Sequence, residues 1–145
     1  MSNRINVLKT EPAAYKAMLG LEQYLETTGL SKTHQELIRI RASQINGCAY
    51  CINMHTKDAR KAGETEQRIY ALNAWHDTNY FTPEEEAILA LTEEVTLITN
   101  RVSDETYQRA AQLFSEHYLA QIIMAIVAIN AWNRISITTR LLPAD

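Results

Sequence analysis

The sequence of 145 residues is poor in glycine and proline, with only four and three of them. An all-β fold needs many tight turns, and these two residues supply many of the backbone conformations that turns require. No stretch approaches the roughly 18 apolar residues that a membrane-spanning helix needs, and the first residues lack the apolar segment of a secretory signal. We therefore expect a helical, cytoplasmic protein that does not associate with membranes.

The sequence also lacks an excess of positive charge. Fourteen Lys and Arg residues stand against 17 Asp and Glu residues, which gives a formal net charge of −3. We do not expect nucleic acid to be a partner, because the chain has no excess of positive charge to attract its phosphates. Apolar residues at 46% and charged residues at 21% are typical of a globular protein. The length favours a single domain over residues 1–145.

Cysteine is scarce as well, and both cysteines, Cys48 and Cys51, lie within eight residues of His55. In a helix the three side chains project from one face, because they are spaced at i, i+3 and i+7. In a cytosolic protein, a cysteine pair at this spacing is more often catalytic or metal-binding than a structural disulfide.

Apolar residues at helical spacing, bounded by glycine, proline and capping residues, predict an all-α bundle of about seven helices. The expected helices cover approximately residues 10–29, 31–46, 48–63, 65–75, 82–99, 103–114 and 116–134. Thr10 is the expected N-cap of the first, and Thr82-Pro-Glu-Glu85 predicts a capping box for the fifth. The last contains a run of eight apolar residues, 122–129, and we expect it at the centre of the core or at a subunit interface.

The cysteine pair falls at the N-terminus of the third helix, where thiols are activated. A thiol attacks as thiolate, and the unpaired N–H groups of a first turn favour the negative charge. His55 can take up or return a proton. Either thiolate could reduce a peroxide and become a sulfenic acid, which the other thiol would convert to a disulfide.

Three other interpretations of this motif are open at this point, and a fourth, c-type haem attachment, does not fit the residues. The thioredoxin motif has the same spacing, but it needs a strand before the helix, and none is predicted. Cys48, Cys51 and His55 could bind zinc, with Glu36 as the fourth ligand. A c-type haem requires His directly after the second Cys, where Ile52 stands. The two thiols could also be inert core residues beside a hydrogen-bonded histidine.

Glu36 has a structural interpretation of its own. Thr33-x-x-Glu36 matches a capping box, in which the carboxylate would accept a backbone N–H at the start of the second helix. Spacing alone favours this interpretation over catalysis.

Glu36, Cys48, Cys51 and His55 together form the pattern E-x11-C-x-x-C-x-x-x-H. This pattern resembles the signature of the AhpD-like alkylhydroperoxidases of the carboxymuconolactone decarboxylase superfamily. The surrounding residues 41–63 and the segment 128–134 are also similar to small, single-core members of this family, so the resemblance covers most of the chain.

The resemblance implies an all-helical homo-oligomer, trimeric or hexameric, with thiol peroxidase activity. It implies that Cys51 is the peroxidatic cysteine, that Cys48 is the resolving cysteine and proton donor, and that Glu36 and His55 form the proton relay. Peroxide would be the substrate, and an external dithiol, carried by a lipoyl-bearing or thioredoxin-like protein, would be the reductant. No bound cofactor or metal is expected.

Tyr50 is a departure from the best-studied pattern, which can carry a histidine directly before the second cysteine. A phenol is a poor base at neutral pH but can pass a hydrogen bond. The decarboxylase branch of the superfamily lacks the paired cysteines, which weighs against that reaction here. The main alternative is a redox-responsive oligomeric binding protein with little turnover. A decarboxylase and a metal-binding module are less favoured alternatives.

Overall fold

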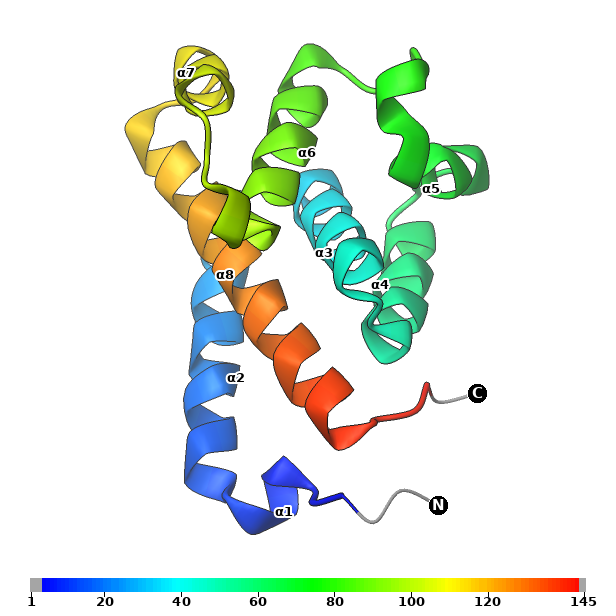
Figure 1. Ribbon diagram of the computed structural model, residues 1–145, viewed down its shortest axis with the longest axis vertical. Helices are drawn as coiled ribbons and strands as arrows, with labels where there is room; N and C mark the ends of the chain where they lie inside the picture. Colours follow the sequence, from blue (N-terminus) through cyan, green and yellow to red (C-terminus); the bar gives the residue numbers. More distant parts are fainter. Residues whose placement is uncertain (1–3, 144–145) are drawn as a thin grey trace.

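The computed structural model describes residues 4–143, and over these residues the chain is all helical, with no strand (Figure 1). The predicted all-α class is therefore confirmed. There are eight α-helices and two short 3-10 helices among the described residues. They are α1 (Val7–Thr10), α2 (Pro12–Glu26), α3 (Lys32–Asn46), α4 (Ala49–Lys61), α5 (Glu66–Ala71), η1 (Leu72–Asp77), α6 (Pro83–Thr96), η2 (Ile98–Asn100), α7 (Asp104–Leu113) and α8 (Glu116–Thr139).

Local side-chain caps explain where several helices begin. The predicted capping box of α6 is present, with Thr82 accepting from the Glu85 N–H and Glu85 accepting from the Thr82 N–H. The predicted cap at Thr10 is wrong. Thr10 is the last residue of the extra helix α1, and Glu11 precedes α2 without making a side-chain cap bond. Asn6 caps α1, because its side-chain amide oxygen accepts from the backbone N–H of Lys9.

The junction between α3 and α4 positions the cysteine pair. Gly47 ends α3 in the left-handed conformation, with φ of 71°, which residues with a Cβ rarely adopt. Cys48 is the N-cap of α4, and Cys51 is the third residue of that helix. The prediction that both cysteines lie at the N-terminus of a core helix is thus confirmed.

Helix α8 is the central element of the fold, and α2, α3, α4, α6 and α7 all pack against it (Figure 1). Its buried apolar side chains include Ile122, Ile126 and Ile129, but Val127 is 44% exposed, so the helix is not buried on every side. Among the described helices, α8 has the length and apolar composition that a membrane span would need. A core helix meets the same criterion, and its packing against five helices is that of a core helix.

Helix α2 projects from the rest of the bundle as an arm, with α1 at its far end (Figure 1). Its single buried residue is Leu25, in its last turn. Two further features differ from the sequence prediction. The expected helix 65–75 is divided into α5 and η1, and Ala74 within η1 has non-helical φ and ψ angles. Helix α8 continues to Thr139, beyond the predicted end at residue 134.

Candidate active site

Cys48 and Cys51 lie together in the first turn of α4, and both are free thiols that are only 1% exposed. The Cys48 sulfur caps the helix by accepting the backbone N–H of Cys51 at 3.4 Å. The two sulfurs therefore lie at the end of the helix where unpaired N–H groups and the helix dipole favour negative charge.

His55 lies one turn beyond Cys51 and contacts Glu36 of the neighbouring helix α3. The distance between His55 Nδ1 and Glu36 Oε2 is 3.1 Å, and both side chains are buried. An ionised carboxylate only accepts hydrogen bonds, so Nδ1 is the donor and Nε2 of the neutral ring carries the free lone pair. Glu36 thus orients the histidine so that the opposite nitrogen can accept a proton.

Two cations hold Glu36 in its ionised form. Lys32 Nζ and Arg39 Nη1 each lie 2.9 Å from Glu36 Oε1. Burial alone would raise the pKa of the Glu36 carboxyl, but hydrogen bonds from His55 and Lys32 outweigh it and lower the pKa to about 2. The capping-box interpretation of Glu36 is wrong, because Ser31 is the N-cap of α3 and accepts from the backbone of the residue three positions on.

Arg39 extends this charged cluster to the arm. Its Nη2 lies 2.9 Å from Oε2 of Glu22 on α2, and the other oxygen of Glu22 accepts from the indole N–H of Trp132, also at 2.9 Å. The ring of Trp132 is packed edge to face against Tyr15, with centroids 5.5 Å apart. The arm is therefore attached to the body directly beside the charged cluster.

A cavity of about 260 Å³ opens onto these groups, and its wall is mostly apolar or aromatic. It is lined by Tyr15, Leu19, Glu22, Tyr50, Cys51, Met54, His55, Trp132, Ile135, Ser136 and Leu141. Cys51 and His55 both face this cavity, whereas Cys48 does not line it. A molecule in the cavity would therefore meet the second cysteine of the pair.

The Cys51 thiol is protonated at rest. Its burial and its contact with Cys48 raise its pKa to about 12, against the opposing effect of hydrogen bonds from Asn133 and Ser136 of α8. The thiol donates to Ser136 Oγ at a distance of 3.9 Å. Attack by Cys51 therefore requires a base to remove its proton.

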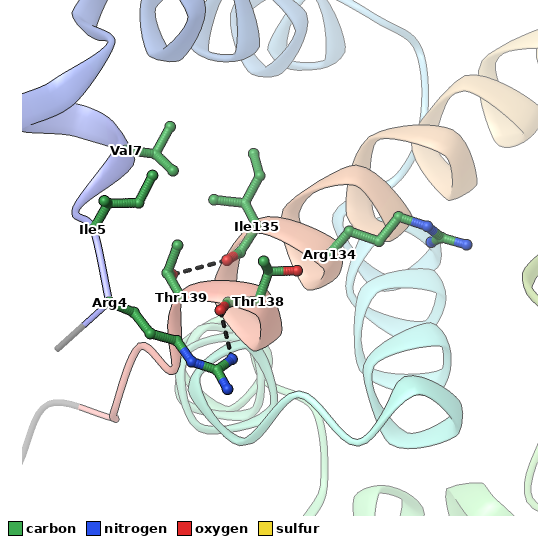
Figure 2. A pocket seen from close by; sticks show the side chains of 7 residues that line it. All are labelled: Arg4, Ile5, Val7, Arg134, Ile135, Thr138 and Thr139. Atoms are coloured by element: carbon green, nitrogen blue, oxygen red, sulfur yellow. Dashed lines mark hydrogen bonds between the residues drawn. The ribbon is translucent and has the colours of Figure 1, made fainter. Parts of the chain in front are cut away.

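A larger groove of about 540 Å³ lies between the N-terminal segment and the last turns of α8 (Figure 2). Arg4 crosses it and donates to the backbone carbonyl of Thr138 at 2.7 Å. Among the described residues, 4–143, its wall contains no thiol, histidine or carboxylate, so these residues offer no such nucleophile or base there. We therefore place the candidate site in the smaller cavity.

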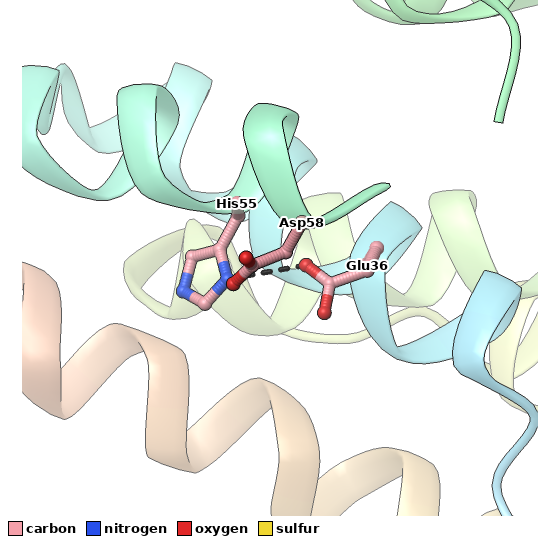
Figure 3. A group of neighbouring side chains, drawn as sticks. All are labelled: Glu36, His55 and Asp58. Atoms are coloured by element: carbon pink, nitrogen blue, oxygen red, sulfur yellow. Dashed lines mark hydrogen bonds and ion pairs between the residues drawn. The ribbon is translucent and has the colours of Figure 1, made fainter. Parts of the chain in front are cut away.

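Glu36, His55 and Asp58 point toward one another, with potential ligand atoms within 4.8 Å (Figure 3). In the part of the chain from residue 4 to residue 143 this is the group that could hold a metal ion, and Cys48 and Cys51 do not belong to it. The zinc set of two thiols, histidine and glutamate is thus not brought together. The carboxylate of Glu36 is already paired with two cations, which makes it a poor ligand for a third.

The structure brings Glu36 to His55, and Cys51 to the same cavity as His55, as the sequence pattern predicts. Tyr50, singled out as a departure from that pattern, also lines the cavity. The sequence reasoning missed the charged pair Glu22 and Arg39 and the polar residues of α8 that contact Cys51. A signal was present for Asn133, which is a polar residue in a helix predicted to lie in the core, whereas Ser136 lies beyond the predicted end of that helix at residue 134.

The model of the carboxymuconolactone decarboxylase family matches residues 12–94 of the chain. The uncharacterised protein YdfG of Bacillus subtilis is 48% identical over 138 residues, covering 94% of each chain. A crystal structure of a protein of unknown function from Agrobacterium tumefaciens, described in connection with the antioxidant defence protein AhpD, superposes with a TM-score of 0.96. It is 37% identical, and the match covers 100% of this chain and 99% of that one.

Two more distant structures share the fold. A peroxidase-related protein with an alkylhydroperoxidase AhpD core from Ralstonia eutropha has a TM-score of 0.84 at 20% identity, covering 96% of this chain and 75% of that one. The debrominase Bmp8 has a TM-score of 0.85 at 17% identity, covering 94% and 74% of the two chains. The fold is therefore shared by a debrominase and by an uncharacterised protein described as peroxidase-related.

Proposed function

Because the chain belongs to the carboxymuconolactone decarboxylase family and has an AhpD-like fold, we propose that it is a thiol peroxidase reducing organic hydroperoxides or hydrogen peroxide. The observation that carries the proposal is the cavity that Cys51 shares with His55. The Nδ1 nitrogen of His55 is hydrogen-bonded to the ionised carboxylate of Glu36. A nucleophile, a base and a group that orients the base are the three parts of an activated-thiol site.

In the first step, His55 Nε2 removes the proton of the Cys51 thiol, and the thiolate attacks one oxygen of the peroxide. A sulfur–oxygen bond forms as the oxygen–oxygen bond breaks, and the leaving alkoxide or hydroxide takes the proton from His55. Sulfur is oxidised by two electrons to a sulfenic acid, and the peroxide is reduced to an alcohol or water. The Glu36 carboxylate stabilises the imidazolium that exists between the two proton transfers.

Cys48 completes the cycle as the resolving cysteine. Its sulfur lies in the same turn as Cys51 and behind the cavity, where it can attack the sulfenic acid without displacing substrate. The sulfur–sulfur bond forms as the sulfur–oxygen bond of the sulfenic acid breaks, and its hydroxyl group leaves as water with the proton of the Cys48 thiol. An external dithiol, on a lipoyl-bearing or thioredoxin-like protein, then restores both thiols and is itself oxidised to a disulfide. The scheme uses no bound cofactor and no metal.

We further propose that the protein is a cytoplasmic homo-oligomer, a trimer or a hexamer, with no nucleic-acid or membrane partner. Support comes from apolar side chains that stay exposed on the arm and on α8, among them Leu19, Tyr24, Val127 and Ile137, each more than 40% exposed. Contact with other copies would cover them.

The test is consumption of cumene hydroperoxide or hydrogen peroxide by purified protein with dithiothreitol as reductant. We expect turnover in the wild type and none in Cys51→Ser. Unchanged consumption in Cys51→Ser would refute the role of Cys51. Parallel assays with a lipoyl protein and with thioredoxin would identify the class of reductant.

A second candidate is a redox-responsive oligomeric binding protein, in which the disulfide forms slowly and alters assembly. The high pKa of the Cys51 thiol, about 12 because of its burial, favours this candidate. Kinetics separate the two, because a sensor would oxidise no faster than free cysteine while a peroxidase must react much faster.

A further inference from the structure

Two polar side chains of α8, Asn133 and Ser136, lie close to Cys51. Asn133 is completely buried, and Ser136 is 5% exposed and lines the cavity. The Cys51 sulfur contacts Ser136 Oγ at 3.9 Å, and a hydrogen bond from Asn133 lowers the pKa of the Cys51 thiol. Burying a polar group is costly unless it is hydrogen-bonded, so the position of two such groups beside a reactive sulfur calls for an explanation.

The amide of Asn133 has a fixed orientation. Its Oδ1 accepts from Asn46 Nδ2 at 2.9 Å, and its Nδ2 donates to Ser43 Oγ at 3.0 Å. An amide nitrogen carries two N–H groups, so a second N–H remains for the Cys51 thiol, whose pKa a hydrogen bond from Asn133 lowers. Asn46 can only donate through its amide nitrogen, so it prevents Asn133 from turning its oxygen toward the sulfur.

The Ser136 hydroxyl can hydrogen-bond to the Cys51 sulfur both when it is a thiol and when it is a thiolate. A hydroxyl group is a donor and an acceptor and rotates to suit its partner. It accepts the S–H proton of the neutral thiol, as the structure has it. Once His55 has removed that proton, rotation about the Cβ–Oγ bond lets the hydroxyl donate to the thiolate instead.

From this geometry we infer that Asn133 and Ser136 are catalytic residues, a pair of hydrogen-bond donors that stabilises the Cys51 sulfur when it is charged. The inference rests on the proposed function for the identity of the nucleophile. Fixed donors directed at a developing charge in a dry site act as an oxyanion hole does, because no reorganisation is needed at the moment of reaction. The donors come from a helix that lies outside the matched residues 12–94.

The titratable groups around this sulfur are Cys48 in the same turn and His55 one turn on. The cavity wall adds Tyr15, Glu22 and Tyr50. The test therefore uses a Cys48→Ser background, in which Cys51 is the chain's one thiol. Serine is a favoured N-cap, so this background keeps the start of α4. The measurement is the second-order rate of Cys51 alkylation by iodoacetamide between pH 7 and pH 10.

We expect Ser136→Ala and Asn133→Ala each to slow alkylation about tenfold or more at every pH in this range, because a hydrogen bond to a charged group contributes roughly 1.5–3 kcal/mol. Ser136→Thr, which retains the hydroxyl, should restore the rate. A purely structural role predicts the opposite result, since removing a side chain from the cavity wall opens access to the thiol.

Matched controls come from the same helix. Thr139→Val removes a hydroxyl that bonds to the backbone of Ile135, and Asn130→Ala disturbs another partner of Asn46 without touching the sulfur. Both should alkylate within twofold of the background protein. Equal or faster alkylation in Ser136→Ala would overturn the inference. If Asn133→Ala does not fold, the result for Ser136→Ala alone tests the inference. If these rates shift as expected but the wild type consumes no peroxide, the proposed peroxidase fails and the donor assignment stands.

Discussion

Replacing Glu36 by glutamine tests whether the charged cluster stabilises the protein through ionised Glu36. The side chain is 2% exposed and is paired with Lys32, Arg39 and His55 at 2.9, 2.9 and 3.1 Å. Glutamine has nearly the same shape and can still accept the hydrogen bond from His55, so Glu36→Gln removes the charge and little else.

The size of the effect follows from the pKa of this carboxyl. Its fall from an ordinary value of 4.5 to about 2 in the folded chain corresponds to about 3 kcal/mol, at roughly 1.4 kcal/mol for each pH unit. The folded pKa lies below the unfolded one, so this stabilisation is complete above about pH 4.5. It is lost as the pH falls toward 2, because the unfolded chain binds the proton first.

The assay is urea unfolding of the wild type and of Glu36→Gln at several pH values between 7 and 2.5. We expect the variant to be less stable by about 3 kcal/mol at neutral pH, and the difference to shrink to a small fraction of this at pH 2.5. Other carboxyls with lowered pKa, such as Glu85 and Glu94, titrate in both proteins and cancel in the difference. The exposed Glu26→Gln is the control and should show no such trend. A difference between wild type and Glu36→Gln that does not change with pH would refute the reasoning.

Four further predictions concern the site and its surroundings. In Cys48→Ser, peroxide should leave a sulfenic acid on Cys51 that dimedone traps as a mass adduct; an adduct on Cys48 in Cys51→Ser would reverse the roles. Gly47→Ala should lower the free energy of unfolding by about 1 kcal/mol because of its φ of 71°, whereas Gly20→Ala, inside α2 with open space around it, should raise it by up to about 1 kcal/mol. Tyr50→His should increase the rate of peroxide turnover at pH 7, since imidazole is a base there; an unchanged rate would exclude position 50 from the relay. Sedimentation should find a species of trimer or hexamer mass, and a single monomer would contradict the proposed assembly.

The helices were predictable because their signals are local. Thr82 and Glu85 form a capping box that depends on four consecutive residues, and Gly47 ends a helix through its own φ. Where two local signals compete, the sequence does not decide. Ser31 and Thr33 can each cap the second expected helix, and the choice of Ser31 releases Glu36 from the backbone.

The residues that complete the site were not predictable in this way, because their partners are far away in the sequence. Ser136 meets Cys51 across 85 positions, and Trp132 meets Glu22 across 110. Such contacts depend on how α8 crosses α2 and α4, which the periodicity of any single helix does not determine. A polar residue in an apolar helix indicates a buried partner but does not identify it.

In the proposed reaction, the charged cluster and the α8 residues Asn133 and Ser136 would stabilise two different charged groups. Lys32 and Arg39 balance Glu36 and Glu22, so the cluster carries no net charge and an imidazolium formed at His55 meets a carboxylate without a surplus cation behind it. That cluster stabilises the proton after it leaves the thiol, but it does nothing for the negative charge left in a cavity that raises the pKa of the thiol. Hydrogen bonds to the Cys51 sulfur itself would stabilise that negative charge. Helix α8 carries the side chains that lie beside this sulfur.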